Sequence, residues 1–258
     1  MTGWEMLAVA AAGFAAGGIN AVVGSGTLVS FPVLLAVGLP PLPATISNSL
    51  GLVAGNLSGS IGYRRELRGQ RRLLLRLLPA SILGALTGAF LLLTLPAEAF
   101  ETIVPALIGL AVVLVAFQPL LTRSLPARPA DGTAPPVRGG RLLACFVGAY
   151  ATGTYGGYFA ASQGVLQIGI FGLILREPLQ RLNAIKNVLT LAVNAVAALA
   201  YVVVATDRID WTAAALLSAG SLIGGAVSSR YGRRLPAPVL RAAIVVLGLV
   251  AIAVLVTG

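Results

Sequence analysis

The side chains that could do chemistry at depth in this chain are neutral amides and hydroxyls around two glycine-rich breaks. The first break is Gly24-Ser25-Gly26, and the second contains Ser162-Gln163-Gly164. Each leads into a short apolar stretch that we predict to be a helix. The N-terminus of a helix presents unpaired N–H groups and a partial positive charge of roughly half a unit. Two such termini facing each other would suit a small oxyanion.

We therefore predict an anion site between the starts of two short helices at 27–37 and 162–175. Asn48 and Asn187 occupy corresponding places after the two breaks, so they should supply side-chain donors. The predicted contacts are Ser25, Gly26, Thr27, Asn48, Ser162, Gln163, Gly164 and Asn187. Further candidates are Asn20, Tyr155, Tyr158 and Lys186. The amides would serve hydrogen bonds between helices equally well. For Lys186 we favour a charge that anchors the cytoplasmic end of its helix.

Other chemistries are excluded or disfavoured by residues that the chain lacks. It has no His and a single Cys, Cys145, which lies in an apolar stretch. A metal cluster and a Cys/His nucleophile pair are thus ruled out. No carboxylate falls deep within an apolar run, and no nucleotide-binding motif occurs. We expect no enzyme activity, no cofactor and no metal.

The composition is that of a membrane protein. Hydrophobic residues make up 57% of the chain and charged residues only 10%. Several apolar runs approach the roughly 20 residues that a spanning helix needs. The clearest are Leu7 to Val23, Leu73 to Leu95, Ile103 to Leu121, Ile185 to Val204 and Leu240 to Val256. The net charge of +10 comes from loops between such runs, so we expect a lipid bilayer rather than nucleic acid as the partner.

Ten helices account for the pattern, of which eight to ten would be membrane segments. The predicted ranges are 4–23, 27–37, 43–63, 72–95, 98–121, 141–157, 162–175, 180–205, 211–230 and 237–257. The two short helices would cover about half of the hydrocarbon thickness or little more. A segment rich in Pro and Gly at 122–140 divides the chain into a first membrane unit, 1–121, and a second, 141–258.

Basic loops predict the orientation. Arginines crowd the loop at 64–76, flank the linker at 122–140 and follow the helix at 211–230. Placing these loops in the cytoplasm of a bacterial inner-membrane protein puts all 18 basic residues inside except Arg208. Both termini are then periplasmic.

This path makes the two units inverted in topology. Each contains a broken helix hairpin followed by three transmembrane helices, but the first begins outside and the second inside. Weak self-similarity at an offset near 138 residues agrees, since Gly18 aligns with Gly156 and Gly26 with Gly164. We therefore predict an all-α integral membrane protein of two inverted repeats, related by a pseudo-two-fold axis in the membrane plane.

The motifs resemble those of the TauE/SafE sulfite-exporter family in both halves. In the first half they are Gly13-Phe-Ala-Ala-Gly17, Gly24-Ser-Gly26, Phe31-Pro32-Val-Leu-Leu35 and Ala44-Thr45-Ile-Ser-Asn48. In the second they are Tyr155-Gly-Gly-Tyr158, Ala161-Ser-Gln-Gly164 and Leu182-Asn-Ala-Ile-Lys-Asn187. The resemblance implies an inner-membrane permease that exports sulfite, sulfoacetate or related organosulfur anions. The chain departs from the commoner pattern at Ser25-Gly26-Thr27, where a longer glycine run is frequent.

Four functions remain open. The favoured one is a secondary transporter for a small anion, sulfite or a sulfonate, that works by alternating access with a proton or sodium as a coupling ion. A channel or a carrier for another small solute could use the same fold. A membrane scaffold without a substrate would not require helix breaks at corresponding places in both halves. A membrane enzyme lacks a nucleophile–base pair. The residues do not indicate an oligomeric state.

The orientation can be tested by cysteine labelling. In a Cys145→Ser background, Gly69→Cys and Gly132→Cys should resist a membrane-impermeant maleimide applied to intact cells, because both positions belong to basic loops. Both should react once the membrane is permeabilised. Ready labelling of either in intact cells would contradict the assignment.

Overall fold

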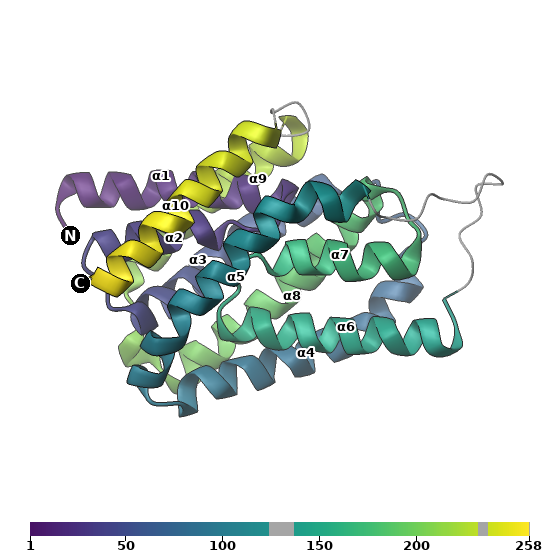
Figure 1. The fold of residues 1–258 in the computed structure, drawn as a ribbon, viewed down its shortest axis with the longest axis horizontal. Helices are drawn as coiled ribbons and strands as arrows, with labels where there is room; N and C mark the ends of the chain where they lie inside the picture. Colours follow the sequence, from purple (N-terminus) through teal and green to yellow (C-terminus); the bar gives the residue numbers. More distant parts are fainter. Residues whose placement is uncertain (124–136, 232–236, 258) are drawn as a thin grey trace.

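The computed structural model describes residues 1–123, 137–231 and 237–257. In this part of the chain the fold consists of ten α-helices and one short 3₁₀ turn, without strands (Figure 1). The first five helices are α1 (Gly3–Val22), α2 (Thr27–Ala36), α3 (Pro41–Gly62), α4 (Arg71–Thr94) and α5 (Ala97–Arg123). After the linker come α6 (Gly139–Tyr158), α7 (Gln163–Leu175), α8 (Leu179–Val204), η1 (Thr206–Arg208), α9 (Trp211–Tyr231) and α10 (Ala237–Thr257).

The predicted helices are confirmed, with ends within two residues of those predicted. Most of the linker, including Gly132, lies outside the described residues. Five of the described helices are long and apolar enough to cross a membrane: α1, α4, α5, α8 and α9. With 10 and 13 residues, α2 and α7 extend only about 15 and 20 Å. Neither can span the bilayer alone.

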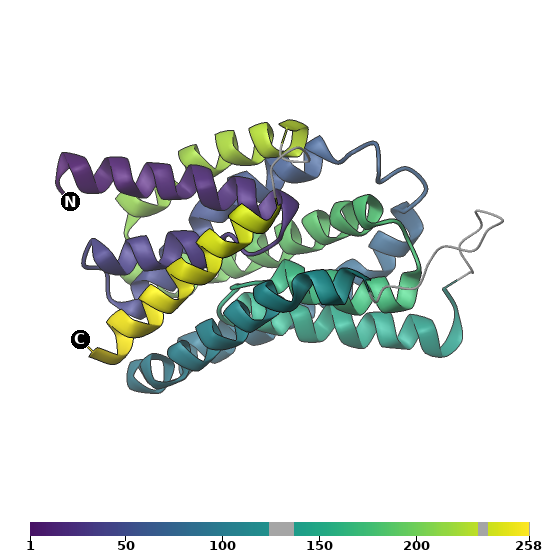
Figure 2. The same ribbon diagram turned by 45° about the horizontal axis from the view of Figure 1, so that its top comes forward.

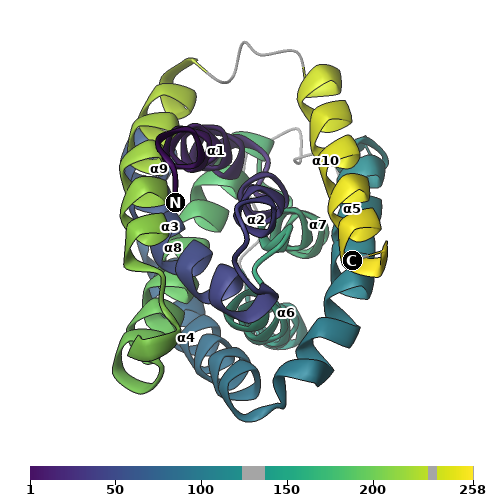
Figure 3. The ribbon, with the colours of Figure 1, turned by 90° about the vertical axis from the view of Figure 1, so that its left-hand side faces the viewer.

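Both termini lie at one end of the bundle, and the loop between α3 and α4 lies at the other (Figures 1 and 2). From the middle of the molecule α2 extends toward the end with the termini, whereas α7 extends toward the opposite end (Figure 1). Viewed along the bundle, α2 and α7 lie side by side near its centre and the longer helices surround them (Figure 3). The two short helices therefore begin near each other and diverge.

Glycines let the longer helices pack at very short distances. Between α1 and α9, a Cβ atom on Gly17 would lie 2.2 Å from the carbonyl oxygen of Ser221. Between α4 and α6, a Cβ on Gly88 would lie 2.1 Å from the carbonyl oxygen of Thr154. Any larger residue would push the backbones apart. Each contact joins a helix from the first half of the chain to a helix from the second half, so the two halves interlock.

Two tyrosines that a sequence reading would place at the membrane boundary lie in the interior. Tyr63 and Tyr201 end apolar segments, which is typical of residues at the membrane–water boundary. Both are buried, with 1% and 0% of their surface exposed, and the hydroxyl of Tyr201 donates to the carbonyl oxygen of Gly157. Trp211, the first residue of α9, is by contrast 54% exposed, as a residue at the boundary would be. The outer surface carries large apolar side chains, as a lipid-facing surface requires. Examples are Leu83, Phe90, Leu199 and Val203.

The close packing predicts opposite effects for two glycine-to-alanine changes. Gly17→Ala should lower the free energy of unfolding by about 1–3 kcal/mol, because the new methyl group meets the α9 backbone. Gly109→Ala on α5 meets nothing within 4 Å and should be neutral or stabilising by up to about 1 kcal/mol. Thermal denaturation in detergent, followed by size-exclusion chromatography, measures both. Equal melting temperatures for the two variants would show that the α1–α9 contact is loose.

Candidate functional site

The two helix breaks meet at a pair of glycines. The N–H of Gly164 donates to the carbonyl oxygen of Gly24 over 3.1 Å. A Cβ atom on Gly24 would lie 2.5 Å from the Cα of Gly164, and Gly24 itself has a φ of +90°. Only glycine permits both this backbone angle and this approach. The sequence prediction that the two breaks face each other therefore agrees with the structure.

Lys186 lies directly beside this contact. Its Cδ would be 3.2 Å from a Cβ on Gly24 and 2.7 Å from one on Gly164, so the lysine stem passes along both glycines. Its Nζ donates to the carbonyl oxygens of Asn20 at 2.7 Å and Ala21 at 3.3 Å. These carbonyls belong to the last turn of α1, where helical carbonyls lack partners and the helix dipole is negative. The side chain caps α1 from another unit of the protein.

The interpretation of Lys186 as an interfacial anchor is wrong. The residue is only 1% exposed and sits in the middle of the bundle rather than at a helix end facing water. No carboxylate lies within ion-pair distance of its Nζ in the described part of the chain. Burying an ammonium group without a counter-charge costs several kcal/mol. Such residues in membrane proteins usually mark a functional site.

Three asparagines surround the lysine cap. Asn187, the next residue of α8, donates from Nδ2 to the Ala21 carbonyl at 3.2 Å. Asn20 donates to Oδ1 of Asn56 on α3 and accepts from the N–H of Gly26 at 3.4 Å. Asn20 is one of the further candidates predicted from the sequence, whereas Asn56 was not predicted. The sequence feature that could have identified Asn56 is its position as a polar residue deep within an apolar segment.

A second group joins α2 to α3. Asn48 donates from Nδ2 to Oγ1 of Thr27 at 3.2 Å and accepts from the hydroxyl of Ser30 at 2.5 Å. Its amide is therefore satisfied within the first unit. Asn187, by contrast, bonds across to the first unit. The two asparagines thus differ in their partners although their helices correspond.

Two buried polar side chains at the helix breaks, Gln163 and Ser25, lack described partners. Ser162 adopts a left-handed conformation with φ +59°, and its hydroxyl donates to the carbonyl oxygen of Ala111 at 3.3 Å. The amide of Gln163 is packed against Gly156 and makes no side-chain hydrogen bond among the described residues. The buried hydroxyl of Ser25 also lacks a described partner. Both groups could bind a ligand without breaking an existing bond.

Tyr155 and Tyr158 lie apart from this cluster. They line a cavity of about 510 Å³ between α4, α5 and α6 together with apolar side chains such as Leu91 and Ile103. The ring of Tyr158 also packs edge-on against Phe100 at 5.6 Å between centroids. The structure therefore separates these two candidates from the remaining predicted residues.

The central cluster is rich in hydrogen-bond donors. It combines one ammonium group, several amides and the starts of two helices, all of which donate hydrogen bonds. Among the described residues, no group of His, Cys, Asp or Glu could hold a metal ion. Gly24 and Gly164 fill the space between the two breaks in this conformation.

Comparisons with known proteins point to membrane transport. The profile of the family described as Sulfite exporter TauE/SafE matches residues 9–255. A "Probable membrane transporter protein" of Haemophilus influenzae is 33% identical over 107 residues, which are 41% of this chain and 42% of that protein. "Probable membrane transporter protein ORF9" of a Sinorhizobium species is 31% identical over 97 residues, or 38% and 37% of the two chains. In both cases the match covers less than half of the relative's length.

A third relative matches along most of its length. "Probable membrane transporter protein YfcA" of Escherichia coli K12 is 23% identical over 230 residues, which are 87% of this chain and 81% of that protein. No solved structure matches the chain.

Because the buried amide of Gln163 has no described partner, we expect it to lower the free energy of unfolding. Gln163→Met, which keeps the length of the side chain, should raise the free energy of unfolding by about 1–3 kcal/mol because it removes a buried polar group without a partner. Asn48→Leu should lower it by a similar amount, since it breaks two hydrogen bonds. Thermal denaturation in detergent compares them. A loss of stability in Gln163→Met would mean that the amide is bonded in the resting protein.

Proposed function

Because the chain belongs to the Sulfite exporter TauE/SafE family, we propose that it is a secondary transporter for a small anion, sulfite or a related sulfonate. Membrane transport itself agrees with the family and with the five apolar helices of membrane length. The substrate class and the alternating-access mechanism are the proposal.

The observation that carries the proposal is the buried ammonium group of Lys186 without a carboxylate partner. Its two hydrogen bonds to the carbonyls of Asn20 and Ala21 offset only part of the cost of burial. An oxyanion beside the ammonium group would supply the missing charge. Asn187 and Gln163 are next to the same contact and offer amide donors that a sulfite or sulfonate oxygen accepts. A cationic solute would be repelled by the ammonium group, and a neutral one would leave its charge uncompensated.

Alternating access is supported by the paired arrangement of the two units. We propose that residues 1–121 and 141–258 are inverted repeats about an axis in the membrane plane. The contact of α1 with α9 has its counterpart in that of α6 with α4, and the contact of α2 with α10 has its counterpart in that of α7 with α5. The opposite directions of α2 and α7 agree with the inversion (Figure 1). Rocking of one unit against the other would open the site to each side in turn.

We place the Arg-rich loops in the cytoplasm and both termini in the periplasm, in an inner membrane. This orientation rests on the excess of arginine at one end of the bundle. A proton or sodium ion would couple transport to the membrane gradient.

Flux in liposomes tests the proposal. Purified protein should move sulfite or ethanesulfonate, and Lys186→Met, Asn187→Ala and Gln163→Ala should each weaken apparent affinity by about ten- to a hundredfold, as expected for loss of one hydrogen bond to a charged ligand. Asn194→Ala is the matched control, because this buried asparagine lies two turns further along α8.

Size-exclusion chromatography in detergent, at equal expression levels, checks that each variant is folded. Normal flux in both Asn187→Ala and Gln163→Ala would place the substrate elsewhere. Flux of uncharged solutes with no response to sulfite would favour a carrier or channel for another solute.

A further inference from the structure

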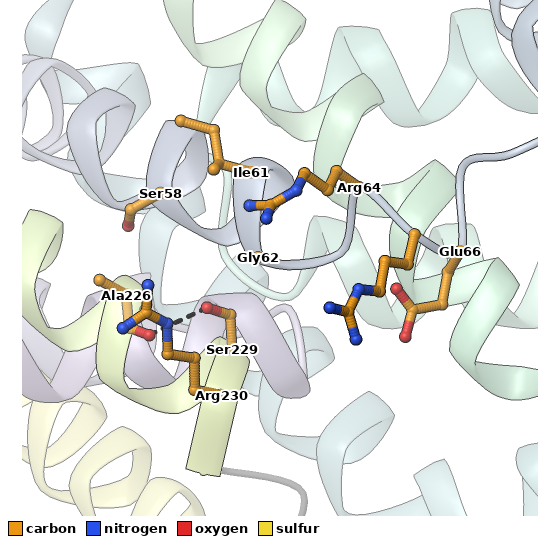
Figure 4. Close-up of a pocket in the computed structure, with 9 residues that line it drawn as sticks. Ser58, Ile61, Gly62, Arg64, Glu66, Ala226, Ser229 and Arg230 are labelled. Carbon is orange, nitrogen blue, oxygen red and sulfur yellow. Dashed lines mark hydrogen bonds between the residues drawn. The ribbon is translucent and has the colours of Figure 1, made fainter.

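A second cavity opens at the Arg-rich end of the bundle, between the end of α3 and the end of α9. It has a volume of about 660 Å³. The residues around it are Ser58, Ile61, Gly62, Arg64, Arg65, Glu66, Ala226, Ser229 and Arg230 (Figure 4). We propose that this cavity is an anion-binding vestibule, in which a small sulfur oxyanion binds while still hydrated before it reaches Lys186. The inference rests on the proposed function for its ligand class.

The charges of the cavity favour an anion. Arg64 and Arg65 come from the loop after α3, and Arg230 comes from α9, so three guanidinium groups from two elements line one space. Glu66 is the single acidic residue in the lining. Two excess positive charges within several ångströms of a monovalent anion in a wet cavity enrich it on the order of tenfold. Guanidinium groups also match the geometry of sulfonate and sulfite oxygens.

The volume of the cavity suits a hydrated ion rather than a stripped one. Its volume exceeds that of a small anion and leaves room for water molecules around it. An anion can therefore enter without losing its hydration shell, and it can leave just as readily. The vestibule should bind the anion weakly and raise its local concentration. The buried central cluster should distinguish the substrate from other anions.

The vestibule ends close to the central cluster. Gly62 lines the cavity, and Gly59 lies one turn deeper on α3, about 5 Å along the helix. A Cβ atom on Gly59 would lie 3.3 Å from the Cβ of Ala21 and 3.8 Å from Nδ2 of Asn187. Ala21 is the residue whose carbonyl receives both Lys186 and Asn187. A single turn of α3 therefore separates the cavity from the residues around the buried lysine.

Another basic cavity provides a matched control. It has a volume of about 360 Å³ and lies at the start of α4, against the loop between α7 and α8. Its charged lining residues are Arg68, Arg72, Arg76, Arg181 and Glu177. Neutralising arginines here changes the net charge of the same end of the protein but not the charge of the vestibule.

The test uses a cysteine reporter and does not depend on transport. Ala226 is exposed and lines the vestibule, so Ala226→Cys in a Cys145→Ser background provides one reactive thiol. The measurement is the ratio of its modification rates by an anionic and a cationic methanethiosulfonate, in full-length protein in neutral-lipid nanodiscs. Arg64→Gln combined with Arg230→Gln should lower this ratio about tenfold. Arg68→Gln combined with Arg72→Gln should leave it unchanged.

Ethanesulfonate at millimolar concentration should slow the anionic reagent in the reference protein and not in the Arg64/Arg230 variant. A ratio that is unaffected by neutralising Arg64 and Arg230 would overturn the vestibule. So would protection by phosphatidylglycerol but not by ethanesulfonate, which would identify a lipid headgroup site. If the ratio and the protection hold while liposomes carry no sulfite or sulfonate, the vestibule stands and the proposed function fails. If liposomes carry sulfite but the modification ratio does not depend on Arg64 and Arg230, the proposed function stands and the vestibule fails.

Discussion

The contact between the backbones of Gly24 and Gly164 is the constraint on which the rest of the structure depends. One hydrogen bond and a van der Waals approach bring together two chain breaks that lie 140 residues apart. Because neither residue has a Cβ, α2 and α7 can begin at nearly the same depth and extend in opposite directions (Figure 1). The stem of Lys186 fits against the same two glycines. Larger residues would remove both the meeting of the helices and the space for the lysine.

Lys186 gives this contact its chemical character. An ammonium group in the core of a membrane protein needs carbonyl oxygens, a carboxylate or an anionic ligand to be tolerated. The end of α1 supplies two carbonyls, and no carboxylate is near in the described part of the chain. The amides of Asn20, Asn56 and Asn187 complete the polar surroundings. The same lysine therefore links α8 to the end of α1 at the centre of the bundle.

The two ends of the contact are not equally satisfied. On the side of α2, Thr27, Ser30 and Asn48 bond to one another. On the side of α7, the amide of Gln163 has no described partner. Directly before α2, only the hydroxyl of Ser25 adds a buried group without a described partner. Unsatisfied buried groups weaken the packing around them. The amide of Gln163, with both its nitrogen and its oxygen unpartnered, is thus the least satisfied side chain at the contact.

Hydropathy, glycine positions and the distribution of arginine determined the helices, the two breaks and the end of the bundle that carries the basic loops. Each of these depends on local composition or on position along the membrane normal, which a single chain records directly. Only the tertiary structure decided which way each helix faces. Lys186, Tyr63 and Tyr201 have sequence neighbours that suit the membrane boundary, yet all three are buried. Asn56 belongs to the central cluster because α3 directs it toward Asn20. Tyr155 does not belong to it, because α6 directs its side chain into the apolar cavity between α4, α5 and α6. Rotation about a helix axis depends on contacts between residues far apart in the chain. Those contacts arise only when Gly24 meets Gly164 and the two units interlock.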